Sequence, residues 1–380
     1  DPAGAQVGPY RTMVEAVAMR TTGLGGDSEV HFRSEGLAGG ITLGPRRVLP
    51  ISLIAHEAPD VVLPALDRQL RAVMLGDYDG QFVRAVPGGD TAGLSARDQA
   101  VLARIGAQTH PLDRLLSTRV EYLSIQRLVA RGLVQLSGVT PSDASHVLGM
   151  LSAWNREAAA IGLALIARRR TGAGDPLARA PEQMAKIIID QLTAQTSKAM
   201  LTSAFAEETD PYGASPPALA DHELLQRGLR RAAGLVKIEA RLDVDVIGLG
   251  ASASTYYPAV GEALNCDVIL PEHAAVANAI GAVVGRITMR RSGTITAPLE
   301  GVFRVHFIEG PQDFYSEDDA LLALETWLCD TARAEVEESG SDTVQVSSHR
   351  DIRRARSEAR ELFIEAVISV EATGRPRVAQ

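Results

Sequence analysis

The stretch Val244-Asp245-Val246-Ile247-Gly248-Leu249-Gly250-Ala251-Ser252 decides the fold of this sequence. Its β-branched residues predict a short strand that ends directly at a glycine loop. A helical pattern over residues 257–264, a strand over 268–270 and an Ala-rich helix over 274–284 follow. This β-loop-α-β-α order is typical of α/β proteins, and glycine loops between strand and helix often approach a nucleotide. A dinucleotide fingerprint is not expected, because no acidic residue follows about 20 positions later at a strand end.

Working outward, the segment 10–54 also consists of short apolar runs joined by glycine turns. Between the two segments, residues 56–235 have helical spacing of Ala, Leu, Arg and Glu. We expect helices at 61–75, 96–105, 143–151, 154–170 and 181–205. We therefore predict an α/β fold in which residues 1–55 and 236–295 form one discontinuous domain, interrupted by a helical insertion at 56–235.

The end of the chain, residues 296–380, predicts a small α+β domain. Apolar residues alternate over 303–307 and 362–370, which indicates strands, and 317–336 has helical spacing. The segment 350–360 is dense in Arg and Glu and favours a solvated connector or a short helix. Inside the insertion, a helix over 122–130 and another beginning at Thr140 outline a helix-turn-helix or winged-helix unit, for which we favour a structural or interaction use over DNA binding.

Composition excludes several classes of function. The chain has 380 residues and a net charge of −9, which disfavours general nucleic-acid binding. It has two cysteines, Cys266 and Cys329, which are too few for a disulfide framework and fit a reducing cytoplasm. Its eight histidines show no metal-ligand spacing, and no apolar stretch is long enough for a membrane span. We expect a cytoplasmic protein that binds neither nucleic acid nor membrane.

The loop Gly23-Leu24-Gly25-Gly26-Asp27-Ser28 is the second candidate site. Without Cβ atoms, main-chain N–H groups converge easily on an anion such as phosphate. Asp27 offers a carboxylate to a hydrated magnesium ion. The same glycines also fit a tight turn with positive φ angles and no ligand, so both interpretations stay open at this point.

Several motifs resemble, in order, the later part of hydantoinase/oxoprolinase family proteins. They are Thr21–Ser28, Leu43–Arg47, Gly138–Ala144, Gly248–Ala251, Val276–Ala282 and Glu371–Pro376. That family, which includes the A-type hydantoinase subunit and 5-oxoprolinase, is similar to the actin-like ATPases. The resemblance implies a partial actin-like (ribonuclease H-like) ATPase domain with a large helical insertion and a small C-terminal α+β domain.

The resemblance also implies an activity, namely ATP-dependent opening of a cyclic amide such as a hydantoin or 5-oxoproline, with Mg²⁺. Asp27 would be the catalytic and metal-binding residue. The implied nucleotide-binding residues are Gly23, Gly25, Gly26, Ser28, Gly248, Gly250, Ala251, Ser252 and Asn278.

The family's phosphate motif, Asp-x-Gly-Gly-Thr-x-Thr-Asp, lies upstream of this region and does not occur here. We therefore expect a C-terminal portion that is inactive alone and works as an oligomer with its N-terminal portion or a B-type subunit. Two alternatives remain: a kinase-like, sugar-responsive transcriptional regulator, and a non-catalytic subunit of an acetone carboxylase-like complex.

Overall fold

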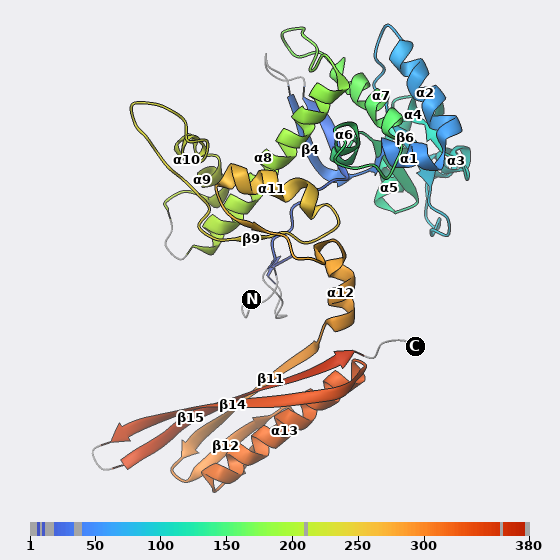
Figure 1. The fold of residues 1–380 in the computed structure, drawn as a ribbon. Helices are drawn as coiled ribbons and strands as arrows, with labels where there is room; N and C mark the ends of the chain where they lie inside the picture. Colours follow the sequence, from blue (N-terminus) through green and yellow to red (C-terminus); the bar gives the residue numbers. More distant parts are fainter. Residues whose placement is uncertain are drawn as a thin grey trace. The chain divides into compact units, whose positions relative to one another are not determined.

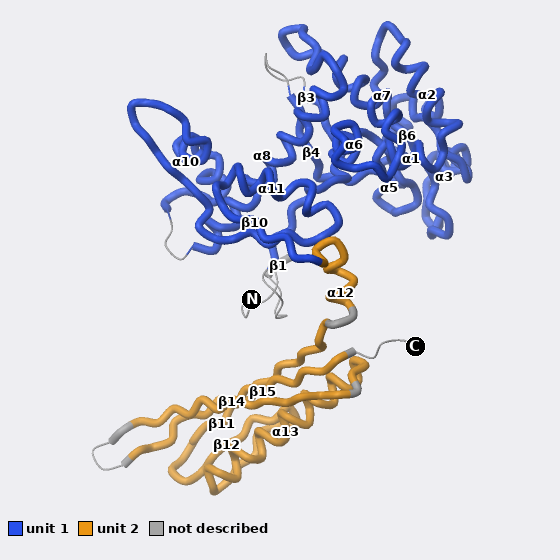
Figure 2. The backbone as a smooth tube through the Cα atoms, in the orientation of Figure 1, with its two compact units in different colours: residues 1–272 blue, residues 273–380 orange. Residues whose placement is uncertain are grey.

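The computed structural model describes residues 6–7, 10–11, 19–33, 40–208, 212–357 and 360–376. The chain is a mixed α/β protein that divides into two compact units, residues 1–272 and 273–380 (Figure 2). The predicted α/β class is confirmed. Among the described residues, every helix is too short or too polar to cross a membrane.

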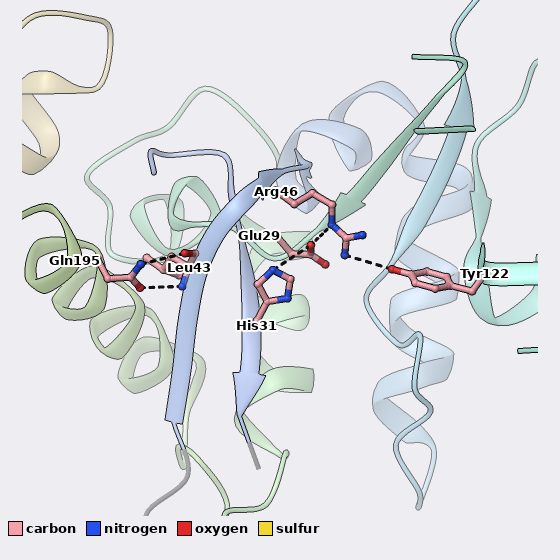
Figure 3. Close-up of polar contacts among 6 residues, drawn as sticks. All are labelled: Glu29, His31, Leu43, Arg46, Tyr122 and Gln195. Carbon is pink, nitrogen blue, oxygen red and sulfur yellow. Dashed lines mark hydrogen bonds and ion pairs between the residues drawn. The ribbon is translucent and has the colours of Figure 1, made fainter. Parts of the chain in front are cut away.

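The first unit begins with two antiparallel strand pairs. Strands β1 (Gln6–Val7) and β2 (Tyr10–Arg11) pair with each other, as do β3 (Ser28–Arg33) and β4 (Gly40–Arg47). One face of the β3–β4 pair is apolar and buried through Val30, Ile41 and Leu43. The pair is fixed to the long helix α8 (Pro181–Glu207), because the Gln195 side chain accepts from the N–H of Leu43 at 2.9 Å and donates to its carbonyl at 3.1 Å (Figure 3).

A four-stranded sheet follows in the order β5-β8-β6-β7. Its strands are β5 (Leu49–Pro50), β6 (Phe82–Ala85), β7 (His110–Pro111) and β8 (Val134–Gly138). The helices around it are α1 (Ile51–Glu57), α2 (Pro59–Arg71), α3 (Ala96–Ile105), α4 (Leu112–Leu115) and α5 (Glu121–Ala130). Among its described residues, the segment predicted as a helical insertion thus contains three short strands, which are defined by their pairing within this sheet.

Strand β8 also changes the interpretation of the suspected helix-turn-helix. The first helix of that outline is α5, and the second is α6 (Pro141–Val147). Between them, β8 pairs with both β5 and β6 instead of forming a tight turn. The tight turn of a simple helix-turn-helix is therefore not formed, because strand β8 of the sheet lies between α5 and α6.

The rest of the first unit is built around α8 (Figure 1). Its other elements are α7 (Arg156–Ala167), α9 (Pro216–Ala220), α10 (Glu223–Leu229), β9 (Val246–Ile247), α11 (Ala253–Leu264) and β10 (Val268–Ile269). Strands β9 and β10 run parallel, with Val246 opposite Val268, and α11 connects them. Helix α11 packs against α8 through buried Val260 and Leu264, in one apolar cluster with Leu201.

The second unit is a five-stranded antiparallel sheet in the order β13-β12-β11-β15-β14. The 3₁₀ turn η1 (Ala274–Val276) and helix α12 (Ala277–Val284) precede its strands. The sheet consists of β11 (Ile287–Leu299), β12 (Val302–Phe307), β13 (Gly310–Phe314), β14 (Ser341–Ser357) and β15 (Arg360–Pro376). Helix α13 (Glu317–Glu338) covers one face, where Leu324 and Leu328 meet Ile368 and Val370 (Figure 1).

Two details of this unit differ from the sequence-based outline. Residues 287–295, which we assigned to the α/β domain, are hydrogen-bonded to β15 in this second sheet. The segment 350–360 is not a connector or a helix, because its described residues extend β14 and begin β15. Pairs such as Arg353 opposite Glu365, with an ion pair at 3.6 Å, let a charged sequence form a strand.

Candidate functional site

The first glycine loop, Gly23–Ser28, is held by hydrogen bonds within itself. The N–H of Gly25 donates to Ser28 Oγ at 2.8 Å, and the N–H of Ser28 donates to the Gly25 carbonyl at 3.1 Å. The loop lies against strand β4, where Gly44 has φ +64° and a Cβ would come within 2.3 Å of the Gly23 carbonyl oxygen. Glycine at position 44 is therefore required for this close approach.

Two consecutive N–H groups of this loop have no hydrogen-bond acceptor among the residues that the structure describes. Within the part of the chain that the structure describes, the N–H groups of Gly26 and Asp27 donate to no acceptor, whereas those of Leu24, Gly25 and Ser28 do. Gly26 and Asp27 are half-buried. Adjacent main-chain donors of this kind form small concave sites for anions.

Asp27, the predicted magnesium ligand, already has a cationic partner. The Arg47 guanidinium lies 2.5 Å from Asp27 Oδ2, and the Arg47 side chain is 78% exposed. Because an exposed ion pair contributes little, Arg47 could move aside for a metal ion at small cost. In the described residues no three His, Cys, Asp or Glu side chains converge, so Mg²⁺ on Asp27 would draw its other ligands from water and phosphate.

The second glycine loop, Gly248–Ser252, connects β9 to α11. The N–H of Gly248 donates to the Ile269 carbonyl at 2.9 Å, and a Cβ on Gly248 would lie 2.7 Å from Leu270 Cδ2. The close approach of the Leu270 side chain thus explains why glycine occupies position 248. Gly250 has φ +110° and open space around its Cα, and Ala251 and Ser252 are exposed.

Helix α11 begins at Ala253, four residues earlier than the sequence pattern indicated, and Ser252 is its N-cap. The side chain of Ser252 makes no capping hydrogen bond. The first N–H groups of a helix carry a partial positive charge, but at this end of α11 those of Ala253 and Thr255 already donate to the carbonyls of Gly250 and Ser252, each at 3.1 Å.

Tyr256, one turn into α11, joins the two loops. A Cβ on Gly26 would lie 3.3 Å from the Tyr256 hydroxyl and 2.9 Å from Ser142 Oγ, so only glycine fits here without displacement. The Tyr256 hydroxyl also lies 3.2 Å from Ser145 Oγ on α6. The side chain is buried, and burial raises the pKa of Tyr256 while hydrogen bonds with Ser145 and Ser142 oppose this shift.

Gly26 therefore lies next to a helix that begins about 4.5 Å before Tyr256, at about 1.5 Å rise per residue. Asn278, another predicted nucleotide-binding residue, lies in α12 of the second unit, whereas both glycine loops belong to the first unit. Sequence reasoning missed Tyr256, Ser142 and Ser145. Their contacts connect positions more than a hundred residues apart, and no local pattern marks them.

Helix α6, which carries Ser142 and Ser145, is fixed by a buried carboxylate. Thr140 caps the helix in a reciprocal arrangement with Asp143. Asp143 also accepts from the N–H and the hydroxyl of Ser52 at 2.8 and 2.6 Å. Burial raises the pKa of Asp143, and the hydrogen bonds from Ser52 and Thr140 oppose that rise. These hydrogen bonds hold the start of α6, which carries Ser142 and Ser145, against the start of α1.

Searches against protein families, curated proteins and solved structures find no match to this chain. The site is thus described by its geometry alone. It consists of main-chain N–H groups at Gly26 and Asp27 that have no acceptor among the described residues, a carboxylate with an exposed counterion, the N-terminus of α11, and a buried tyrosine. Such a set of groups can hold a polyanion and a hydrated cation.

Proposed function

We propose that this chain is the later portion of an ATP-dependent hydantoinase or 5-oxoprolinase type hydrolase. In this proposal the first unit supplies part of an actin-like nucleotide site, and the substrate is a small cyclic amide. The observation that carries the proposal is the contact between Gly26 and Tyr256, because it brings the strand-loop-helix segment 246–264 next to the glycine loop 23–28.

Each group of the site has a role in the proposal. The N–H groups of Gly26 and Asp27 would donate to phosphate oxygens, with Gly23, Gly25 and Ser28 shaping the loop. Gly250, Ala251 and Ser252 would place a second anionic group at the N-terminus of α11, where the helix dipole favours negative charge. Asp27 would hold Mg²⁺ after Arg47 has moved to solvent.

The proposed reaction consumes one cyclic amide, one ATP and two water molecules, and gives a ring-opened amino acid, ADP and phosphate. An amide carbonyl is a poor electrophile. Mg²⁺·ATP would supply a phosphoryl group to the amide oxygen, so that this oxygen becomes part of a leaving group. The residues named above would bind and orient the phosphates, and Tyr256 would exclude water from one side. Fixed donors aimed at the developing charge contribute most of such catalysis.

The proposal includes a partner. The Asp-x-Gly-Gly-Thr-x-Thr-Asp motif of the family does not occur in this sequence. We place those phosphate contacts on an N-terminal portion or on a B-type subunit, so the chain alone should bind nucleotide weakly and turn over little. Cytoplasmic location and oligomer formation with that partner belong to the same proposal.

Photo-crosslinking with an azido analogue of ATP tests the proposed site. We expect Mg²⁺-dependent labelling of the peptide that contains residues 248–257, and competition by unlabelled ATP. ADP release should depend on a cyclic amide and on the partner that carries the missing motif. Labelling that is spread over other peptides, or that ATP does not reduce, would contradict the nucleotide site.

A further inference from the structure

Helix α13 of the second unit has two stripes of side chains. Its buried residues pack on the sheet and recur every four positions, at Ala320, Leu324, Leu328, Ala332 and Val336. A second set recurs with successive spacings of four, three and four residues, and consists of Asp319, Ala323, Thr326 and Asp330. Alternating spacings of three and four residues are typical of a helix that packs along another helix.

A groove of about 560 Å³ follows this second stripe. Phe307, at the end of β12, and Trp327 of α13 form one wall, where the two rings meet edge to face with their centroids 5.6 Å apart. Leu322 also lines the groove and is 62% exposed. An exposed leucine beside an aromatic pair offers the kind of apolar area that anchors a partner protein.

The charged side chains that line the groove are both carboxylates, those of Asp319 and Asp330. Asp330 follows Asp319 by eleven residues, so the two lie about 16 Å apart along α13, at about 1.5 Å per residue. Asp330 also lies 3.5 Å from Arg333 in an exposed ion pair, which contributes little. The groove is therefore apolar in its middle and acidic at both ends, and it is complementary to a segment with cationic ends.

These charges decide between the possible occupants. Nucleic acid and anionic lipid would meet two carboxylates and no cation among the described residues of the lining. A second copy of the chain would bring like charges together, because an antiparallel pair of α13 helices centred on the groove sets Asp319 against Asp330, and a parallel pair sets each residue against itself. The small residues Ala323 and Thr326 at the centre of the stripe let another helix approach closely.

We propose that this groove binds an amphipathic helix of a partner protein, with an apolar stripe in its middle and Lys or Arg at both ends. An apolar anchor of that helix would lie between Leu322 and the Phe307–Trp327 pair. Cations about three helical turns apart would pair with Asp319 and Asp330. The groove lies wholly within residues 273–380, so its occupant does not depend on the nucleotide site proposed for the first unit.

The test uses the full chain with Trp154→Phe, so that Trp327 fluorescence reports on the groove. The probe is a designed helical peptide of about 18 residues, long enough to span about 27 Å, with Leu at spacings of three and four residues and Lys at both ends of that stripe. One control peptide has Glu in place of each Lys, and another has the same composition in scrambled order. We expect a saturable fluorescence change with the Lys peptide and affinities at least about tenfold weaker for both controls. Equal binding of the Lys and Glu peptides, or no binding of the Lys peptide, overturns the proposal.

The decisive variant is Leu322→Ala, with Leu299→Ala as its matched control. Both leucines are exposed in the second unit; Leu322 lines the groove, whereas Leu299 lies at the end of β11. We expect Leu322→Ala to weaken binding of the Lys peptide about tenfold or more, because the burial of a leucine side chain is lost, and Leu299→Ala to leave binding unchanged. Equal affinities in the two variants would overturn the assignment. Urea unfolding midpoints equal to that of the parent chain show that both variants are folded.

A second pair of variants tests the charges at the two ends. The double variant Asp319→Asn, Asp330→Asn neutralises the groove, and Asp318→Asn, Glu337→Gln removes the same charge from exposed positions of α13 outside the lining. We expect the first to weaken binding of the Lys peptide about fivefold or more, and the second by less than about twofold. Equal effects would indicate unspecific attraction to an acidic chain and would overturn the proposal.

Sedimentation velocity of the chain without peptide tests the remaining occupant, a second copy. We expect the parent chain and Leu322→Ala to sediment alike. A concentration-dependent dimer that Leu322→Ala abolishes would show that a second copy covers the groove, and the proposal of a cationic partner helix would fall.

Discussion

Replacing Gly26 by alanine tests the contact that joins the two glycine loops. The new Cβ would lie 2.9 Å from Ser142 Oγ and 3.3 Å from the Tyr256 hydroxyl, so one of these neighbours must move. Overpacking of this kind costs about 1–3 kcal/mol, and the reduced freedom of the unfolded chain returns about 0.4–1 kcal/mol. We expect a net loss of about 1 kcal/mol in the free energy of unfolding.

A double-mutant cycle with Tyr256→Phe makes this prediction specific. The single variant Tyr256→Phe should cost about 1 kcal/mol, because it removes the hydrogen bond to Ser145. Without the hydroxyl, the nearest Tyr256 atom to the new Cβ is a ring carbon at 3.6 Å, an ordinary contact. The double variant should therefore be less destabilised than the sum of the two singles, by about 0.5–1 kcal/mol.

Urea unfolding followed by tryptophan fluorescence is the assay. The chain has two tryptophans, one in each unit, so in a Trp327→Phe background Trp154 reports on the first unit alone. The control is Gly25→Ala, whose Cβ would meet only Asp27 Oδ1 at 3.6 Å and should not destabilise. The reasoning would be refuted if the destabilisation of the double variant equalled the sum of the two single values within about 0.3 kcal/mol, because residues without mutual contact behave additively.

Three further predictions concern acid, alkali and the second core. A hydrogen bond from Arg127 holds the pKa of Asp98 well below its usual range, so stability of the first unit should fall as pH drops below about 4, and Asp98→Asn should flatten that slope in urea titrations. Burial raises the pKa of Tyr256, so stability should fall as pH rises above about 10, and less steeply in Tyr256→Phe. In the second unit, Leu328→Ala should lower the free energy of unfolding by about 2–5 kcal/mol, because Leu328 is fully buried. Trp327 fluorescence in a Trp154→Phe background measures this loss. The control Leu322→Ala, at an exposed position, should cost less than about 0.5 kcal/mol, and equal losses in the two variants would contradict this packing.

Helices with clear local signals could be predicted from the sequence. Helix α3 begins and ends at the predicted residues, because Ser95 accepts from the N–H of Asp98 and Gly106 follows at φ +54°. Helix α13 begins at the predicted Glu317, where Ser316 is the N-cap. In these segments the caps and the apolar spacing agree with the packing, so local reasoning is sufficient.

The short strands and the joining residues could not be predicted in this way. Strands β6 and β8 have only four and five residues, and their identity depends on pairing with each other. The charged segment 350–357 forms a strand because β15 lies beside it. Both glycine loops could be recognised as candidates, but Tyr256 is a partner of Gly26 only in three dimensions. Tertiary contacts override local propensity at such positions.

The central claim is that the two glycine loops form one binding site for Mg²⁺·ATP. Glycine-selective ¹⁵N labelling tests this directly, because the amide resonances of Gly26 and Gly250 can be followed in the same titration. Gly88 and Gly301 have no neighbouring atom within 4 Å of an added Cβ and serve as internal controls, one in each unit. We predict that the Gly26 and Gly250 resonances shift along one saturation curve with a common dissociation constant, while the controls stay fixed. A shift of only one loop, two different constants, or no shift at millimolar ATP would contradict the claim.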